Sequence, residues 1–115
     1  MCHVLIIEDD ALAATDIRET LERAGATAFS FAASEREAIQ TAAEVCPQVI
    51  TSDVMLERGS GPAAIRAIWA ACGPTPVIFI TATPDQCEDF ADVAILEKPF
   101  HTGQLREIFI AIAPI

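Results

Sequence analysis

A small set of side chains in this sequence could carry out chemistry together, and each follows a short apolar run. The set comprises Glu8, Asp9, Asp53, Thr81 and Lys98. Carboxylates that lie close together repel one another unless a cation lies among them, and carboxylate oxygens are ligands that suit Mg²⁺. A hydroxyl group and an ammonium group beside them could stabilise the negative charge of a phosphoryl group during transfer. The residue types therefore predict a magnesium site that handles phosphoryl groups.

Asp53 is the carboxylate best placed to act as a nucleophile. It stands alone after its apolar run and opens the loop 53–61, which contains two glycines. Glycine allows the backbone to approach an anion closely, and aspartate can accept a phosphoryl group as an aspartyl-phosphate. The pattern predicts Asp53 as the acceptor, with Lys98 and Thr81 near the transferred group.

Short apolar runs alternate along the chain with segments of helical pattern, and this alternation must position the candidate residues. Strands are expected at 4–7, 27–32, 49–52, 77–80 and 93–96. Helices are expected at 12–24, 34–44, 60–72, from 83 onward and around 105–112. Five strand–helix units indicate a three-layer α/β domain with a mostly parallel sheet. Ligands bind such sheets at the carboxyl ends of the strands, where the candidate residues fall.

Local signals mark several helix ends. Asp10 is expected to cap the first helix, and Ser34 with Glu37 forms a capping box for the second. Thr83 is expected to cap the fourth helix. The stretch 81–98 is short, so this fourth helix is expected to be stunted.

Composition limits the class of protein. A chain of 115 residues of which 52% are hydrophobic predicts one domain, residues 1–115, with a core of its own. Seventeen acidic and seven basic residues give a formal net charge of −10. This charge argues against binding to nucleic acid and to anionic membranes, because both need a basic face.

The cysteines and the chain ends predict a compartment. The sequence contains no run of about 20 apolar residues and no export signal, so we expect a cytoplasmic protein. The four cysteines stand far apart without a C-x-x-C motif, and they are therefore expected to be buried and reduced. They are Cys2, Cys46, Cys72 and Cys87.

Four sequence blocks together resemble the receiver domain of two-component response regulators. They are residues 4–10, Asp53 with the loop glycines Gly59 and Gly61, Thr81-Ala82, and Lys98-Pro99-Phe100. The resemblance covers essentially the whole chain and keeps the order of the blocks. It implies a doubly wound (βα)5 fold of the flavodoxin-like or CheY-like type, with a five-stranded parallel sheet in the order 2-1-3-4-5. It also implies a cis peptide bond before Pro99.

The resemblance also implies a function, namely two-component phosphorelay signalling. Asp53 would accept a phosphoryl group from a phosphohistidine of a histidine kinase or histidine phosphotransfer protein. Mg²⁺ would be held by Glu8, Asp9, Asp53 and the backbone carbonyl of Met55, while Thr81 and Lys98 would contact the phosphoryl oxygens. Such a protein is no enzyme in the ordinary sense, because it assists its own modification and then switches a surface that binds another protein.

Two features depart from the family pattern. Ile95 stands where the family usually has a phenylalanine or tyrosine, so no ring can move there during switching. The short fourth helix would give a partner an unusual surface around the fourth and fifth helices. With residues 77–82, these traits are similar to the receiver half of alphaproteobacterial general-stress regulators, and the chain is expected to act as a stand-alone receiver.

Three other functions and a homodimer are compatible with parts of the sequence. A docking module that works without phosphorylation would not need the complete set of candidate residues. A phosphatase of the haloacid-dehalogenase type needs an aspartate two residues after its nucleophile, where this chain has Met55. A flavin-binding protein would need a phosphate loop rich in Ser and Thr after the first strand, where acids stand instead. The apolar tail from Ile110 to Ile115 leaves a homodimer open.

Overall fold

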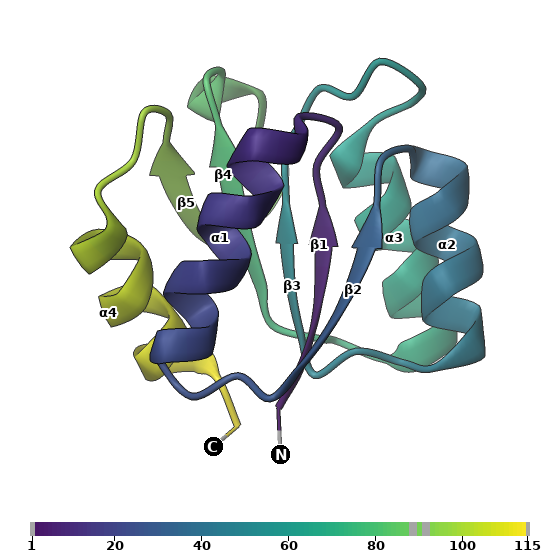
Figure 1. Ribbon diagram of the computed structural model, residues 1–115. Helices are drawn as coiled ribbons and strands as arrows, with labels where there is room; N and C mark the ends of the chain where they lie inside the picture. Colours follow the sequence, from purple (N-terminus) through teal and green to yellow (C-terminus); the bar gives the residue numbers. More distant parts are fainter. Residues whose placement is uncertain (1, 88–89, 91–92, 115) are drawn as a thin grey trace.

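The fold is built around one parallel sheet in the computed structural model, which describes residues 2–87, 90 and 93–114 (Figure 1). The strands are β1 (His3–Ile7), β2 (Ala28–Ala32), β3 (Val49–Ser52), β4 (Val77–Thr81) and β5 (Ala94–Glu97). Their spatial order is β2-β1-β3-β4-β5, and all neighbours are parallel. The predicted fold class and strand order are confirmed, with strand ends within one residue of the expected positions.

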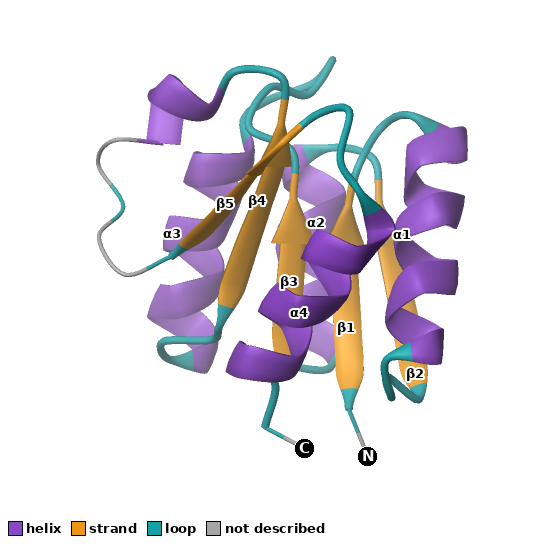
Figure 2. Ribbon diagram, turned by 90° about the vertical axis from the view of Figure 1, so that its left-hand side faces the viewer, coloured by secondary structure: helices purple, strands orange, loops and turns teal. Residues whose placement is uncertain are grey.

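The helices cover both faces of the sheet. They are α1 (Ala11–Arg23), α2 (Glu35–Glu44), α3 (Gly61–Cys72) and α4 (Thr102–Ile112). Figures 1 and 2 show α1 and α4 on one face and α2 and α3 on the other. The predicted caps of the first two helices are confirmed: Asp10 accepts from the Leu12 N–H over 2.9 Å, and Ser34 accepts from the Glu37 N–H over 3.1 Å. No helix in the described part of the chain combines the length and apolar character needed to cross a bilayer.

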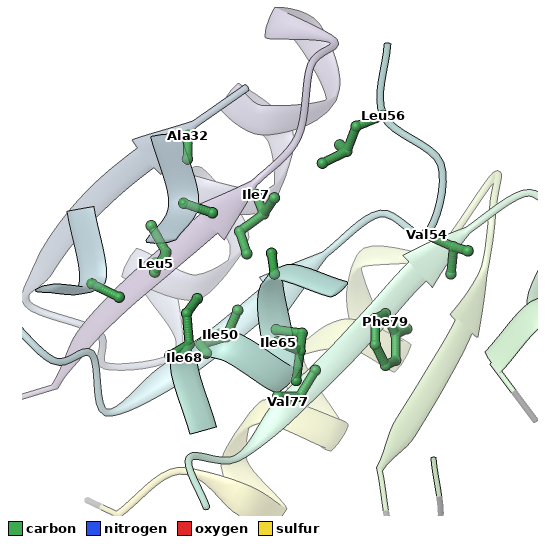
Figure 3. Packing of buried hydrophobic residues seen from close by; sticks show 13 residues of the cluster. Leu5, Ile7, Ala32, Ile50, Val54, Leu56, Ile65, Ile68, Val77 and Phe79 are labelled. Carbon is green, nitrogen blue, oxygen red and sulfur yellow. The ribbon is translucent and has the colours of Figure 1, made fainter. Parts of the chain in front are cut away.

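Two apolar clusters, one on each face of the sheet, hold the strands in place. Alternate residues of the same strands point into different clusters, which is why the runs read as continuously apolar. The cluster under α2 and α3 includes Leu5, Ile7, Ile50, Ile65, Ile68, Val77 and Phe79 (Figure 3). The cluster under α1 and α4 includes Val4, Ile6, Ile17, Leu21, Val49, Ile78, Ile80, Leu105 and Phe109. The strand ends therefore stand on a rigid base.

The segment after β4 contains a single short turn in place of a full helix. It forms a four-residue 3-10 helix, η1 (Pro84–Cys87), so the expectation of a stunted fourth helix is confirmed. Beyond it, the Phe90 ring packs edge-on against Phe79 and Trp69, with centroids 5.1 Å and 5.5 Å away. The Arg66 guanidinium lies 4.9 Å from the centre of the same ring. One aromatic side chain therefore covers part of the sheet face beside the 3-10 turn.

The cysteines correct one expectation. Cys46 and Cys72 form a disulfide, and only Cys2 is a buried free thiol among the described side chains. Cys46 follows α2 and Cys72 ends α3, and packing brings their Cα atoms to 5.7 Å. A separation of 26 residues hid this proximity from sequence reasoning. The side chain of Cys87 lies outside the described part of the structure.

Truncation of Phe90 tests the packing beside the 3-10 turn. We expect Phe90→Ala to lower the free energy of unfolding by about 2 kcal/mol, because it removes a partly buried ring with two aromatic partners. The matched control is Phe31→Ala. The Phe31 side chain is half exposed, so its truncation should lower the free energy of unfolding by well under 1 kcal/mol. Urea denaturation measures the free energy of unfolding of both variants. Equal losses for the two variants would contradict the packing role of Phe90.

Candidate functional site

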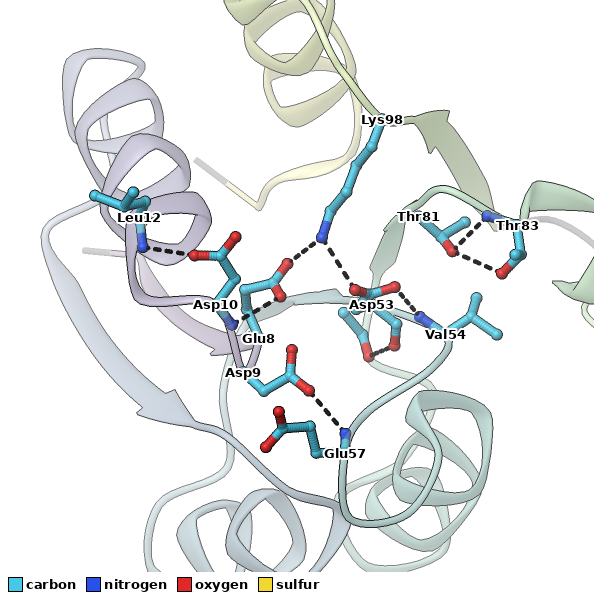
Figure 4. Close-up of polar contacts among 11 residues, drawn as sticks. Glu8, Asp9, Asp10, Leu12, Asp53, Val54, Glu57, Thr81, Thr83 and Lys98 are labelled. Carbon is cyan, nitrogen blue, oxygen red and sulfur yellow. Dashed lines mark hydrogen bonds and ion pairs between the residues drawn. The ribbon is translucent and has the colours of Figure 1, made fainter.

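The ends of four strands bring the predicted residues together at one edge of the sheet. Glu8 follows β1, and Asp53 follows the neighbouring strand β3, where its N–H donates to the Ile7 carbonyl over 3.0 Å. Thr81 ends β4, and its carbonyl accepts from the Lys98 N–H over 2.9 Å. Figure 4 shows the polar side chains converging from these elements.

The ammonium group of Lys98 links two of the carboxylates. Its Nζ lies 2.6 Å from Glu8 Oε1 and 3.0 Å from Asp53 Oδ2. Burial raises the pKa of Glu8, and hydrogen bonds from Lys98 and the Asp10 N–H offset this only in part. Burial also acts to lower the pKa of Lys98, but its hydrogen bonds to Glu8 and Asp53 outweigh this effect and raise the pKa. The lysine is therefore held in its charged form.

Three carboxylates lie within reach of one cation. Oxygens of Glu8, Asp9 and Asp53 all lie within 4.8 Å of one another, and the Lys98 ammonium is the one positive group bonded to the cluster in the described structure. The cluster thus brings together three carboxyl groups and one ammonium group. A hard divalent cation with oxygen ligands fits this donor set, and Mg²⁺ needs only one or two carboxylates besides water.

The loop after β3 fixes the orientation of Asp53. The Val54 N–H donates to Asp53 Oδ1 over 2.7 Å, and the Ser52 hydroxyl donates to the Asp53 carbonyl over 2.8 Å. A side chain at Gly61 would collide with that carbonyl. The sequence predicted that glycine would make room for an anion, whereas at Gly61 it makes room for the backbone of the acceptor residue.

Sequence reasoning missed three hydrogen bonds that hold this loop. Glu35, at the start of α2, accepts from the Ser60 N–H over 3.0 Å, and its own N–H donates to the Arg58 carbonyl over 3.1 Å. The Glu57 N–H donates to Asp9 Oδ2 over 2.7 Å. The only sequence signal for Glu35 was its place in the first turn of a helix, where an acid is favoured for local reasons.

The remaining predicted residues lie around this centre. The Thr81 hydroxyl is bonded to Thr83, whereas the bonds drawn to the Asp53 carboxylate come from Lys98 and Val54 (Figure 4). The Met55 side chain is exposed on the loop, and its backbone forms an antiparallel bridge with that of Ser60.

Removal of the lysine tests the electrostatic balance of the site. We expect Lys98→Met to lower the free energy of unfolding in EDTA by about 3 kcal/mol, because Glu8 and Asp53 lose their cation. Mg²⁺ should recover part of this loss, since a dication neutralises the same carboxylates.

Urea denaturation with EDTA and with Mg²⁺ measures this effect, and Arg106→Met removes an exposed cation as the control. The control should change stability by less than about 0.5 kcal/mol. A Lys98→Met protein as stable as wild type in EDTA, or one indifferent to Mg²⁺, would show that the carboxylates do not depend on a cation.

The fold and the site together define a receiver domain of two-component signalling. The family profile described as the response regulator receiver domain matches residues 4–110. The chain belongs to this family.

Individual relatives show the same likeness. The chain is 32% identical over 111 residues to the phyllosphere-induced regulator PhyR of Methylorubrum extorquens, covering 92% of this chain and 41% of that protein. The solution structure of the PhyR receiver domain of Erythrobacter litoralis has a TM-score of 0.88 and 27% identity, covering 96% of this chain and 88% of that one. The chemotaxis protein CheY4 of Vibrio cholerae has a TM-score of 0.85 and 25% identity, covering 97% and 98% of the two chains.

The chain is shorter than its relatives among curated proteins. It spans 23% of the matched methylesterase of Archaeoglobus fulgidus, 41% of PhyR and 52% of the regulator PdtaR of Mycobacterium tuberculosis. The likeness thus concerns the receiver part of those proteins.

Proposed function

We propose that this chain is a phosphoryl-accepting switch in a two-component phosphorelay, with Asp53 as the acceptor. The donor is a phosphohistidine of a histidine kinase or histidine phosphotransfer protein. The observation that carries the proposal is the Lys98 ammonium, which lies 3.0 Å from Asp53 Oδ2 among carboxylates from β1 and β3. Receiver domains interact with histidine kinases and with downstream proteins, so the reaction fits the family.

Each residue of the site has a separate role in phosphoryl transfer. An oxygen of Asp53 forms a bond to phosphorus while the bond between phosphorus and the imidazole nitrogen of the donor breaks. Before transfer, the Val54 N–H orients the acceptor carboxylate. The Lys98 ammonium neutralises negative charge on the transferred group, and the Thr81 hydroxyl binds one of its oxygens.

Mg²⁺ fits the same arrangement as a cofactor. Glu8, Asp9, Asp53 and the backbone carbonyl of Met55 would hold the ion. When bound, it supplies positive charge against the phosphoryl oxygens. Asp9 is itself positioned for this role by the Glu57 N–H, which fixes one of its two oxygens.

Phosphorylation then shifts the equilibrium between two conformations that present different surfaces to other proteins. In our proposal the chain acts as one receiver unit over residues 1–115 in the cytoplasm, without turnover of a separate substrate. The short η1 turn and the 40% exposed Ile95 side chain shape the surface beside β5. This surface differs from one built on a complete helix, so we expect a downstream partner matched to it.

Chemical phosphorylation tests the acceptor. Incubated with Mg²⁺ and phosphoramidate, wild-type protein should gain one phosphoryl group, measured by intact mass. Asp53→Asn should gain none, because the nucleophilic carboxylate is gone. Asp85→Asn makes the same chemical change at an exposed acid of η1 and should leave labelling intact.

Two results would count against the proposal. Labelling of Asp53→Asn would move the acceptor elsewhere, and undiminished labelling in EDTA would remove Glu8 and Asp9 from a metal role.

The Met55 side chain is expected to lengthen the life of the phosphorylated state. Its exposed apolar bulk lies two residues after the acceptor and would shield the phosphoryl group from water. Met55→Asn should shorten the half-life of phospho-Asp53 several-fold, whereas Met55→Leu keeps the bulk and should leave it near the wild-type value. Intact mass followed over time after removal of the donor measures the half-life. The shielding idea fails if the asparagine variant decays at the wild-type rate.

A further inference from the structure

The hydroxyl group of Thr81 is held by a neighbour and not by the acidic residues. In the described part of the chain its hydrogen bonds are both with Thr83: the Thr83 N–H donates to Thr81 Oγ1 over 3.0 Å, and the two hydroxyl oxygens lie 3.1 Å apart. Figure 4 shows this hydroxyl directed at Thr83, while the Asp53 carboxylate bonds to Lys98 and Val54. A Thr81 hydroxyl that turns toward a phosphoryl oxygen on Asp53 gives up at least part of these contacts.

Thr83 is itself a fixed partner. It precedes Pro84, and a residue before proline is restricted to extended backbone conformations. Its carbonyl accepts from the Gln86 N–H over 3.1 Å, which ties it to the η1 turn. The sequence predicted Thr83 as a helix cap, but its side-chain hydroxyl contacts Thr81. Thr81 is 1% exposed, so water has little access to replace the partner it loses.

We propose that Thr83 is a positioning residue whose hydroxyl holds Thr81 in a resting orientation and so disfavours the phosphorylated state. The proposal rests on the phosphoryl-accepting function of Asp53. A neutral hydrogen bond between side chains biases such an equilibrium about five-fold. Release of Thr81 also frees the side chain that stands directly before η1. This route to the protein surface does not require a ring at Ile95.

The equilibrium can be measured with beryllium fluoride, which mimics a phosphoryl group on a carboxylate. Thr83→Val keeps the size of the side chain and the backbone N–H but loses the hydroxyl. We expect it to bind beryllium fluoride in the presence of Mg²⁺ about five-fold more tightly than wild type. Thr83→Ser keeps a hydroxyl at this position and should bind beryllium fluoride with the wild-type affinity. Unchanged or weaker binding by Thr83→Val would overturn the proposal.

A double-mutant cycle shows whether Thr83 acts through Thr81. In a Thr81→Ala background there is no hydroxyl to hold, so Thr83→Val should no longer change the affinity. A purely structural contribution of Thr83 would persist in this background. An equal effect of Thr83→Val in both backgrounds would therefore overturn the proposal.

The resting orientation can also be observed without any phosphoryl mimic. Three-bond NMR couplings to the Thr81 methyl group should report a single rotamer in wild type and averaging between rotamers in Thr83→Val. Averaging in wild type, or one rotamer in both proteins, would overturn the holding role of Thr83. If wild type keeps a single rotamer but binds no beryllium fluoride and gains no phosphoryl group, the proposed function fails while the holding role is still decided.

Discussion

The ion pairs of Lys98 are the constraint on which the site depends. The Glu8 side chain is 1% exposed, and a buried carboxylate without a cation is costly. The compensating ammonium comes from a residue 90 positions away, directly after the edge strand β5. Correct pairing of β5 with β4 is therefore an electrostatic requirement as well as a matter of hydrogen bonding. The chain has no other lysine that could take this place.

The rest of the site stands on rigid supports. Two apolar clusters fix the strands, and the strand ends fix the carboxylates. Glu35 holds the far end of the loop after β3, and Gly61 lets this loop pass close to the Asp53 carbonyl. A site built in this way keeps its charged groups in place before a ligand arrives, which reduces the reorganisation that binding requires.

The segment after β4 connects the site to the protein surface. A four-residue turn and the ring of Phe90 stand at the position of the fourth helix, which the sequence predicted to be stunted. Thr83 joins this segment to Thr81 through two short contacts. The same few residues thus border the site on one side and the surface beside β5 on the other.

The sequence alone determined the architecture and the main members of the site. Parallel strands end at a common edge, so Glu8, Asp53 and Lys98 could be placed together from their positions after apolar runs. The family resemblance then supplied the strand order. Asp10 and Ser34 were predictable as caps because capping is a contact between near neighbours in the chain.

Only the tertiary structure decided the contacts between segments that are distant in sequence. The disulfide of Cys46 with Cys72 and the hold of Glu35 on the loop both depend on how α2 and α3 pack. The Thr81 hydroxyl contacts Thr83 and not the Asp53 carboxylate, and composition and spacing do not reveal which of the two it meets. Periodicity records which face of an element is buried, whereas the partner met at that face is selected by the packing of the whole chain.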